Sequence, residues 1–156
     1  MKCRYPFDTK KYEVNITKPK GYFAHENFPE SRYAVDFILP LGTPVLAVKK
    51  GIVVFTKHDS EIHHTPKELT RLEESEILEL AEKTLNYTGI RHGSGIFTEY
   101  CHLSRREAIK IGQAVETGNM IGYTGESGIM DLPHLHFNAF KIENGKGISI
   151  PVEFVR

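Results

Sequence analysis

Short β-forming runs separated by glycine and proline recur along the chain, and they limit the folds that it can adopt. Residues 33–39, 44–48 and 52–56 are rich in Val, Ile, Leu and Phe, and Pro40, Gly42 and Gly51 interrupt them. Further runs of this kind cover residues 12–16, 87–91, 96–103, 108–111, 119–123, 134–142 and 148–154. Closely spaced short strands are typical of antiparallel architectures. The sequence therefore predicts a mainly β fold, with an antiparallel sandwich or barrel-like core that contains a groove.

Residues 57–86 interrupt the β pattern and are interpreted as an insertion. Thr65 can cap a helix, Pro66 suits its first position, and Glu68 stands three residues after the cap. An apolar stripe follows, formed by Leu69, Leu72, Ile77, Leu80 and Ala81. We expect one inserted helix over about residues 65–84, with its charged side chains in solvent.

The overall composition fits a single domain over residues 1–156 and narrows the classes of partner. Twenty basic and twenty acidic residues cancel, so nothing indicates a nucleic-acid or membrane partner. No run resembles a signal peptide or a membrane span, which predicts an intracellular location, with an exported mature form as the alternative. Cys3 and Cys101 are interpreted as two reduced thiols, and a disulfide between them stays open.

Two histidines and one aspartate stand out on predicted strands. Because side chains alternate along a strand, His134 and His136 point to one face while Leu135 and Phe137 point to the core. Asp36 lies inside an apolar run, where burying an unpaired carboxylate is costly. It would therefore pair with a base such as Arg32 or bind a metal ion.

A third histidine, His102, ends the run 96–103, where alternation places it on the face of Thr98 and Tyr100, opposite Glu99 and Cys101. Imidazole and carboxylate ligands suit zinc, and spare imidazoles could move protons or stabilise an oxyanion. Tyr100 is interpreted mainly as a packing residue. The remaining histidines in the insertion or in a turn are interpreted as solvated: His58, His63, His64 and His92.

Four segments in register resemble the lysostaphin/LytM-type zinc endopeptidases. They are residues 35–54 around Asp36, residues 100–103 with the sequence Tyr-Cys-His-Leu, residues 112–125, and the His-x-His motif in 133–137. The resemblance covers about residues 22–142. It implies an antiparallel β core with a groove, one Zn²⁺, and hydrolysis of peptide bonds in peptidoglycan-like or glycine-rich peptides. It also implies that Asp36 and His136 bind the metal and that His102 and His134 are catalytic without binding it.

One position departs from that family. The usual first ligand is a histidine four residues before the aspartate, and Arg32 stands there. An arginine stays protonated and cannot bind zinc. We favour the hypothesis that His25 reaches in from the preceding loop as the third ligand. In the alternative, the third ligand is lost and metal binding is weak or absent.

These alternatives lead to different functions. With all ligands present, the chain is expected to be a zinc metalloendopeptidase that uses a metal-activated water. Without them it would be a non-catalytic module that binds a peptide or a protein in the same groove. A biotinyl- or lipoyl-carrier domain is a further alternative, because residues 112–125 have a similar glycine rhythm and Lys141 follows Phe140. That lysine, however, lies late in a long strand instead of at a hairpin tip.

Overall fold

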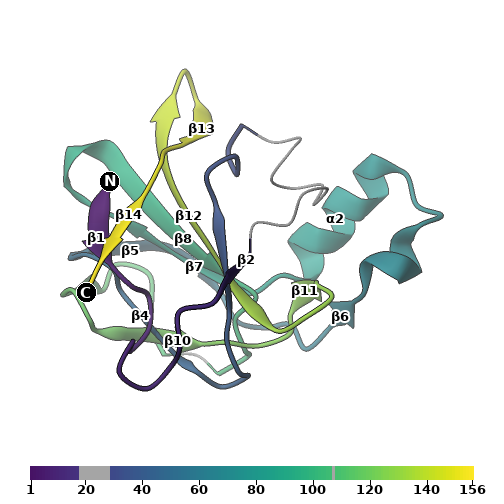
Figure 1. The fold of residues 1–156 in the computed structure, drawn as a ribbon. Coiled ribbons are helices and arrows are strands. Elements are labelled where there is room, and N and C mark those ends of the chain that lie inside the picture. Colours follow the sequence, from purple (N-terminus) through teal and green to yellow (C-terminus); the bar gives the residue numbers. More distant parts are fainter. Residues whose placement is uncertain (18–28, 107) are drawn as a thin grey trace.

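A large antiparallel sheet forms the body of the molecule in the computed structural model, which describes residues 1–17, 29–106 and 108–156 (Figure 1). The sheet has eight strands in the order β2–β3–β12–β8–β7–β5–β9, and β13 pairs with β12. The strands are β2 (Ile16–Thr17), β3 (Val35–Ile38), β5 (Gly51–Lys57), β7 (Tyr87–Arg91), β8 (Ile96–Cys101), β9 (Ala114–Val115), β12 (His134–Glu143) and β13 (Lys146–Ser149). The mainly β, antiparallel prediction is confirmed.

Three two-stranded pairs complete the β structure of the described residues. β1 (Lys2–Arg4) pairs in parallel with β14 (Glu153–Val155), and β4 (Pro44–Leu46) pairs antiparallel with β10 (Met120–Tyr123). β6 (His63–His64) pairs in parallel with β11 (Gly128–Ile129). This last pair joins the insertion to the loop that precedes β12.

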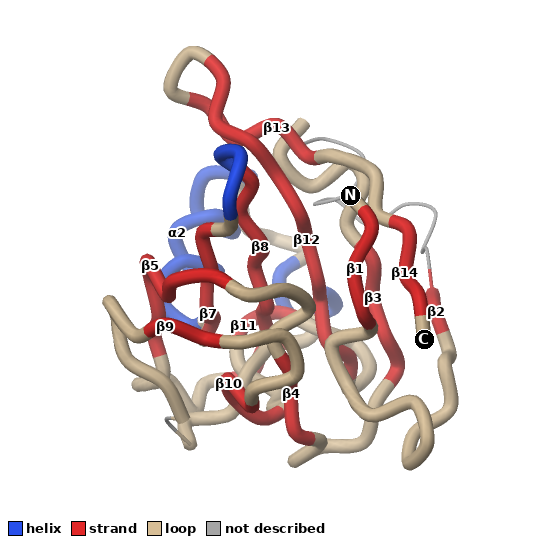
Figure 2. The backbone as a smooth tube through the Cα atoms, turned by 90° about the vertical axis from the view of Figure 1, so that its left-hand side faces the viewer, coloured by secondary structure: helices blue, strands red, loops and turns tan. Residues whose placement is uncertain are grey.

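The main core lies on one face of β3, β8 and β12. Leu135, Phe137 and Ala139 of β12 are fully buried, as the alternating pattern predicts. Aromatic rings fill much of this core: Phe37 lies 5.2 Å from Phe7 between ring centroids, and Phe137 lies 5.3 Å from Tyr100. Figure 2 shows β12 as the long central strand, with β8 on one side and β3 on the other (Figure 2). The opposite face of β12 is therefore free to carry polar groups.

The inserted segment does not form the single helix expected over 65–84. It forms a 3₁₀ helix, η1 (Pro66–Leu69), and then α2 (Glu74–Thr84). Each start carries its own reciprocal cap: the Thr65 amide donates to Glu68 and the Glu73 amide donates to Glu76, each at 2.8 Å. The second start signal, at Glu73, restarts the helix after a break.

Other element boundaries also differ from the predictions. The strand expected over 12–16 is reduced to β2, β1 was not predicted, and residues 108–111 form no strand among the described residues. A short 3₁₀ turn, η2 (Gly93–Gly95), precedes β8. No helix in the described ranges is both long and apolar enough to cross a membrane.

Candidate metal centre and active site

The register between β12 and β3 brings the first two site residues together. His136 pairs directly with Asp36, and residues directly opposite in an antiparallel pair share a face. Asp36 Oδ1 lies 2.9 Å from Nδ1 of His136 and 3.9 Å from Nε2 of His134. Asp36 is 2% exposed. The carboxylate is thus buried against imidazoles, and the alternative of an Arg32 salt bridge is wrong because Arg32 points into solvent.

His102 joins this cluster through an unusual backbone conformation. Its φ of 61° lies in the left-handed region, which a residue other than glycine rarely adopts. This breaks the alternation of β8, so the prediction that His102 shares a face with Tyr100 is wrong. Tyr100 is buried in the core, where its hydroxyl accepts from the Val48 amide, whereas His102 lies 4.6 Å from the His134 ring.

A set of buried hydrogen bonds that sequence reasoning missed holds this turn. The Gly125 amide donates to the His102 carbonyl at 2.8 Å, and Ser127 Oγ donates to the Leu103 carbonyl at 2.9 Å. A Cβ at Gly125 would lie 2.5 Å from the Ser104 amide nitrogen, so only glycine fits there. Asn86, which is fully buried, also donates to the Leu103 carbonyl. These contacts come from distant segments and have no local signal in the sequence.

The rings of His102 and His134 are oriented in the same way. Nδ1 of His102 donates to the Ser127 carbonyl at 2.8 Å, and Nδ1 of His134 donates to the Leu132 carbonyl at 2.8 Å. Both rings therefore carry a proton on Nδ1, and Nε2 of the neutral His102 ring is without one. Burial and the nearby His134 lower the pKa of His102 to about 3. His102 thus stays neutral at pH 7, and its Nε2 is available to accept a hydrogen bond.

The charge of Asp36 has the opposite effect on His136. Burial lowers the pKa of His136, but the hydrogen bond and the charge of Asp36 outweigh it and raise this pKa. Nδ1 of His136 and Oδ1 of Asp36 lie at hydrogen-bond distance, 2.9 Å apart. An imidazole nitrogen and a carboxylate oxygen in this arrangement fit two ligands of one zinc ion.

A complete ligand set is not found among the described residues. No group of three histidine, cysteine, aspartate or glutamate residues could hold a metal ion within residues 1–17, 29–106 and 108–156. The predicted third ligand, His25, lies outside these residues. The structure therefore supplies two adjacent candidate donors, Asp36 and His136, and the third donor stays a prediction.

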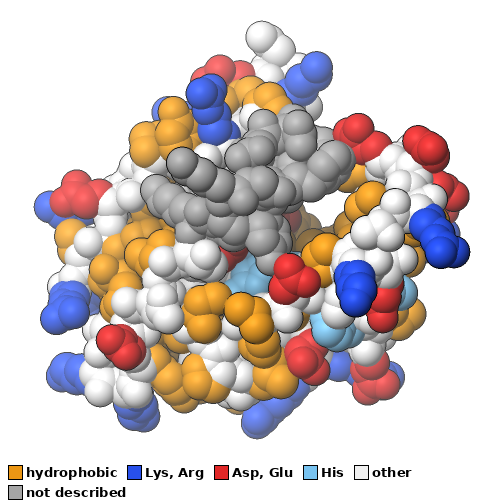
Figure 3. Space-filling model, turned by 45° about the vertical axis from the view of Figure 1, so that its right-hand side comes forward, with side chains coloured by type: hydrophobic (Ala, Val, Ile, Leu, Met, Phe, Trp, Pro, Cys, Tyr) orange, Lys and Arg blue, Asp and Glu red, His pale blue; other side chains and the backbone are white. Residues whose placement is uncertain are grey.

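The cluster lies in a cleft of about 550 Å³. Asp36, His102, His134 and His136 line the cleft from the sheet, together with Glu99 and Cys101 of β8. The inserted segment supplies the opposing lining, which is mostly apolar: Pro66, Leu69, Ile77, Leu78, Ala81 and Leu85. Figure 3 shows the molecule hollowed between the α2 segment and its body, with histidine and acidic side chains at the hollow (Figure 3).

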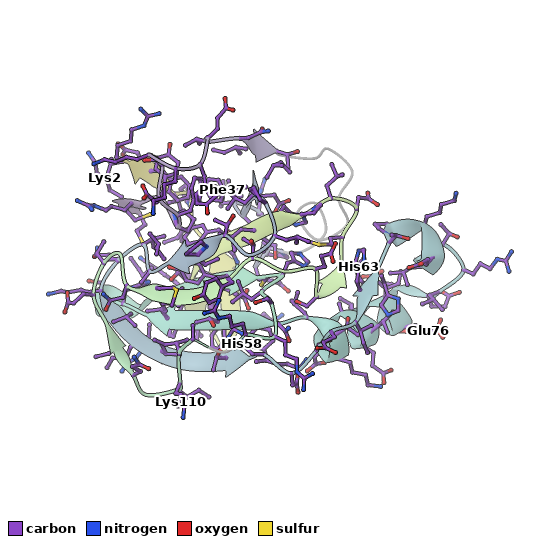
Figure 4. The ribbon with its side chains drawn as sticks, turned by 90° about the horizontal axis from the view of Figure 1, so that it is seen from below. Lys2, Phe37, His58, His63, Glu76 and Lys110 are labelled. Carbon is purple, nitrogen blue, oxygen red and sulfur yellow. The ribbon has the colours of Figure 1, made fainter. Side chains whose placement is uncertain are left out.

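The other described histidines and Cys3 lie apart from this site, whereas Cys101 lines the cleft. His92 is buried and bonds the Lys50 carbonyl and Thr98 Oγ1, and the half-buried His58 bonds the Ser104 carbonyl. The prediction that these two are solvated is wrong, whereas His63 is exposed in the insertion. Figure 4 shows His63 beside α2, far from Phe37 in the core (Figure 4). Both thiols are free, as predicted, and they are buried.

Comparison with known proteins now decides the family. The model of Peptidase family M23 matches residues 30–149, most of the chain. The chain belongs to peptidase family M23. The peptidoglycan DD-endopeptidase ShyA of Vibrio cholerae is 30% identical over 134 residues, which are 86% of this chain and 26% of ShyA. The glycyl-glycine endopeptidase ALE-1 of Staphylococcus capitis is 29% identical over 69% of this chain and 24% of ALE-1.

Solved M23 structures share the fold. A zinc-containing peptidase from Vibrio cholerae superposes with a TM-score of 0.60 at 27% identity, over 94% of this chain and 38% of that chain. The catalytic domain of lysostaphin from Staphylococcus simulans gives 0.59 at 24% identity, over 87% and 88% of the two chains. This chain spans only a quarter to a third of the length of the first curated M23 relatives, at 26%, 33% and 25%.

Proposed function

We propose that this protein is a zinc-dependent endopeptidase that hydrolyses peptide bonds with a metal-activated water. The observation that carries the proposal is the close approach of Asp36 Oδ1 and His136 Nδ1, 2.9 Å apart in a cleft that also holds His102 and His134. Membership of peptidase family M23 supports the same chemistry. A zinc ion held there would lower the pKa of a bound water and polarise the scissile carbonyl.

The two remaining histidines then divide the proton transfers. The Nδ1 contact of His102 leaves Nε2 unprotonated, so in this proposal Nε2 accepts the proton of the attacking water. His134 lies on the adjacent strand, and in this proposal its ring takes up a proton at Nε2 and donates a hydrogen bond from there to the developing oxyanion. The carbonyls of Ser127 and Leu132 accept the Nδ1 proton of each ring and so fix the orientation of both rings.

His25 remains the proposed third ligand. The exposed Arg32 side chain does not line the cleft, so the guanidinium does not occupy the space beside Asp36. The names of ShyA and ALE-1 refer to peptidoglycan and to glycyl-glycine bonds. For this chain we propose a peptide or peptidoglycan-like substrate, since the cleft is large enough for several residues of an extended peptide.

Metal analysis tests the proposal directly. Purified protein is expected to hold one zinc per chain, and Asp36→Ala and His136→Ala are expected to lose it, because each removes a ligand. His63→Ala is the matched control, since this exposed histidine lies outside the cleft. His25→Ala should lose zinc and Arg32→Ala should keep it.

A second measurement separates the enzyme from a binding module. Zinc-loaded protein should cleave glycine-rich or cell-wall peptides, and a chelator should abolish the cleavage. If the wild type holds no stoichiometric zinc, and added zinc does not raise its melting temperature, the endopeptidase proposal is wrong. The non-catalytic reading of the same fold would then stand.

A further inference from the structure

Two carbonyls of the loop between β10 and β12 hold the rings of the proposed proton-transfer histidines. The Ser127 carbonyl accepts from Nδ1 of His102, and the Leu132 carbonyl accepts from Nδ1 of His134. β11 (Gly128–Ile129) lies between these two carbonyls in the chain and begins directly after Ser127. A displacement of β11 is therefore expected to move both acceptors, and with them the Nε2 atoms at which the proposed proton transfers take place.

The beginning of the inserted segment holds β11 in place, although the two are far apart in the chain. β6 pairs in parallel with β11, and the two strands lie beside α2 (Figure 1). The Gly128 amide donates to the Ile62 carbonyl at 2.9 Å, and the Met130 amide donates to the His64 carbonyl at 3.0 Å. Nε2 of His63 donates to the Met130 carbonyl at 3.0 Å. Both main-chain polar groups of Met130, which is 1% exposed, are thus bonded to β6.

The first residue of β11 also fits closely against the end of the inserted segment. Gly128 has a φ of 84°, in the left-handed region that favours glycine. A Cβ at this position would lie 3.0 Å from Cδ1 of Leu85. β11 is therefore held between β6 and Leu85, and a change in the backbone of Gly128 acts on the Ser127 carbonyl directly before it.

We propose that β6 is a positioning element for His102 and His134, because its pairing with β11 fixes the two carbonyls that hold their rings. This inference rests on the proposed endopeptidase function. It gives the base of the inserted segment a role besides the apolar wall that α2 supplies. The residues of β6 touch neither the substrate nor the metal in this proposal and act through the β11 loop. A displacement of about 1 Å at a reacting group can cost roughly 100-fold in rate.

A proline in β6 tests this inference. His64→Pro removes a backbone amide from β6 and disfavours strand pairing, whereas His64→Thr, the matched control, changes the side chain and suits a strand. In zinc-loaded protein, His64→Pro should lower kcat by roughly 10–100-fold, and His64→Thr should keep the wild-type kcat. Both variants should hold one zinc per chain, because neither changes a proposed ligand. Wild-type kcat in His64→Pro, or a loss of its zinc, would overturn the inference.

A pair of glycine variants gives a milder test that does not depend on whether His64→Pro folds. Gly128→Ala strains the backbone of β11 beside Ser127. Gly118→Ala imposes a similar strain at a φ of 89°, in a turn where a Cβ would meet nothing within 4 Å. Gly128→Ala should lower kcat by roughly three- to thirtyfold, and Gly118→Ala should keep the wild-type kcat. Equal values of kcat in the two variants would show that β11 does not position the rings.

Imidazole proton signals keep this inference separate from the proposed function. In metal-free wild type at fixed pH, the carbonyl-bonded Nδ1 protons of His102 and His134 should appear in proton–nitrogen spectra. His64→Pro and Gly128→Ala should shift or lose these signals, and the two control variants should keep them. If no peptide is cleaved but the signals respond in this way, the endopeptidase proposal fails and the positioning role of β6 stands. Unchanged signals in both variants would reject that role, whether or not a peptide is cleaved.

Discussion

The two walls of the cleft are built in different ways. The sheet wall carries Asp36 and His134, both buried on strands that pair with neighbours on each side. The wall from the inserted segment comes from η1, where Leu69 is buried, and from α2, in which only Thr84 is buried and Leu78 is 43% exposed. Chemistry that needs fixed geometry is therefore placed on the rigid sheet, and the adjustable apolar surface is placed on a lightly packed helix.

One residue ties the two walls together. The Asn86 side chain accepts a hydrogen bond from the Ser60 amide and donates one to the Ser60 carbonyl. These two bonds hold together the beginning and the end of the inserted segment, residues 57–86. The same side chain donates to the Leu103 carbonyl, next to His102. The position of the inserted wall and the conformation of His102 therefore share one support.

The largest expected effect concerns the sheet wall. His102→Gln should lower kcat by about 10²–10⁴-fold, because a positioned general base contributes about this much. Zinc content should stay at one per chain, since His102 is not a proposed ligand. Stopped-time peptide cleavage and metal analysis measure the two quantities. Retention of wild-type kcat in His102→Gln would show that the proton acceptor lies elsewhere.

The two walls should also differ strongly in how much a truncated side chain lowers the free energy of unfolding. Phe137→Ala, in the fully buried core beneath the histidines, should lower the free energy of unfolding by about 3–5 kcal/mol. Leu78→Ala, at a half-exposed position of α2, should change it by about 0.5 kcal/mol or less. Urea unfolding of metal-free protein compares them. Similar losses in both variants would contradict the view that α2 is lightly packed.

The sequence predicted what depends on local alternation and missed what depends on distant partners. His134, His136 and Asp36 follow from strand periodicity, and the structure brings all three together. The orientation of His102 could not be predicted, because its positive φ is held by Gly125 and Asn86 from other segments.

The same distinction explains the other errors. His92 was interpreted as solvated because its partners, the Lys50 carbonyl and Thr98 Oγ1, are adjacent only in the fold. The sequence predicts a single helix over 65–84 because the apolar stripe continues across the break between η1 and α2. The second start signal at Glu73 is in the sequence and could have been recognised.

Removing the shared support should affect both walls. Asn86→Ala would leave the buried Ser60 amide and Leu103 carbonyl without this partner, so we expect a loss of about 1–3 kcal/mol in the free energy of unfolding. We also expect a lower kcat through a displaced His102. Asn119→Ala, at an exposed turn, is the matched control. A variant that loses stability but keeps the wild-type kcat would show that the conformation of His102 does not depend on Asn86.

A buried histidine away from the metal should set part of the pH dependence of stability. Burial lowers the pKa of His92 below its ordinary value of 6.5. As the pH falls below about 6.5, the unfolded chain therefore binds a proton at this residue more readily than the folded chain does. The contribution of His92 to the free energy of unfolding is therefore complete above that pH. It decreases on acidification, by at most about 1.4 kcal/mol per pH unit. In metal-free protein, His92→Gln should show a shallower decrease between pH 6.5 and 5 than the wild type. An unchanged slope would contradict the neutral, buried state of His92.

The smallest effect should come from the inserted wall itself. Leu78→Ser removes apolar surface from the cleft without touching the histidines or Asp36, so KM should rise about three- to tenfold while kcat and zinc content stay unchanged. Leu72→Ser, on a similarly exposed residue of the same segment that does not line the cleft, should leave KM as it is. If Leu78→Ser lowered kcat with KM unchanged, the inserted segment would contribute to the transition state, and the division of labour between the two walls would have to be abandoned.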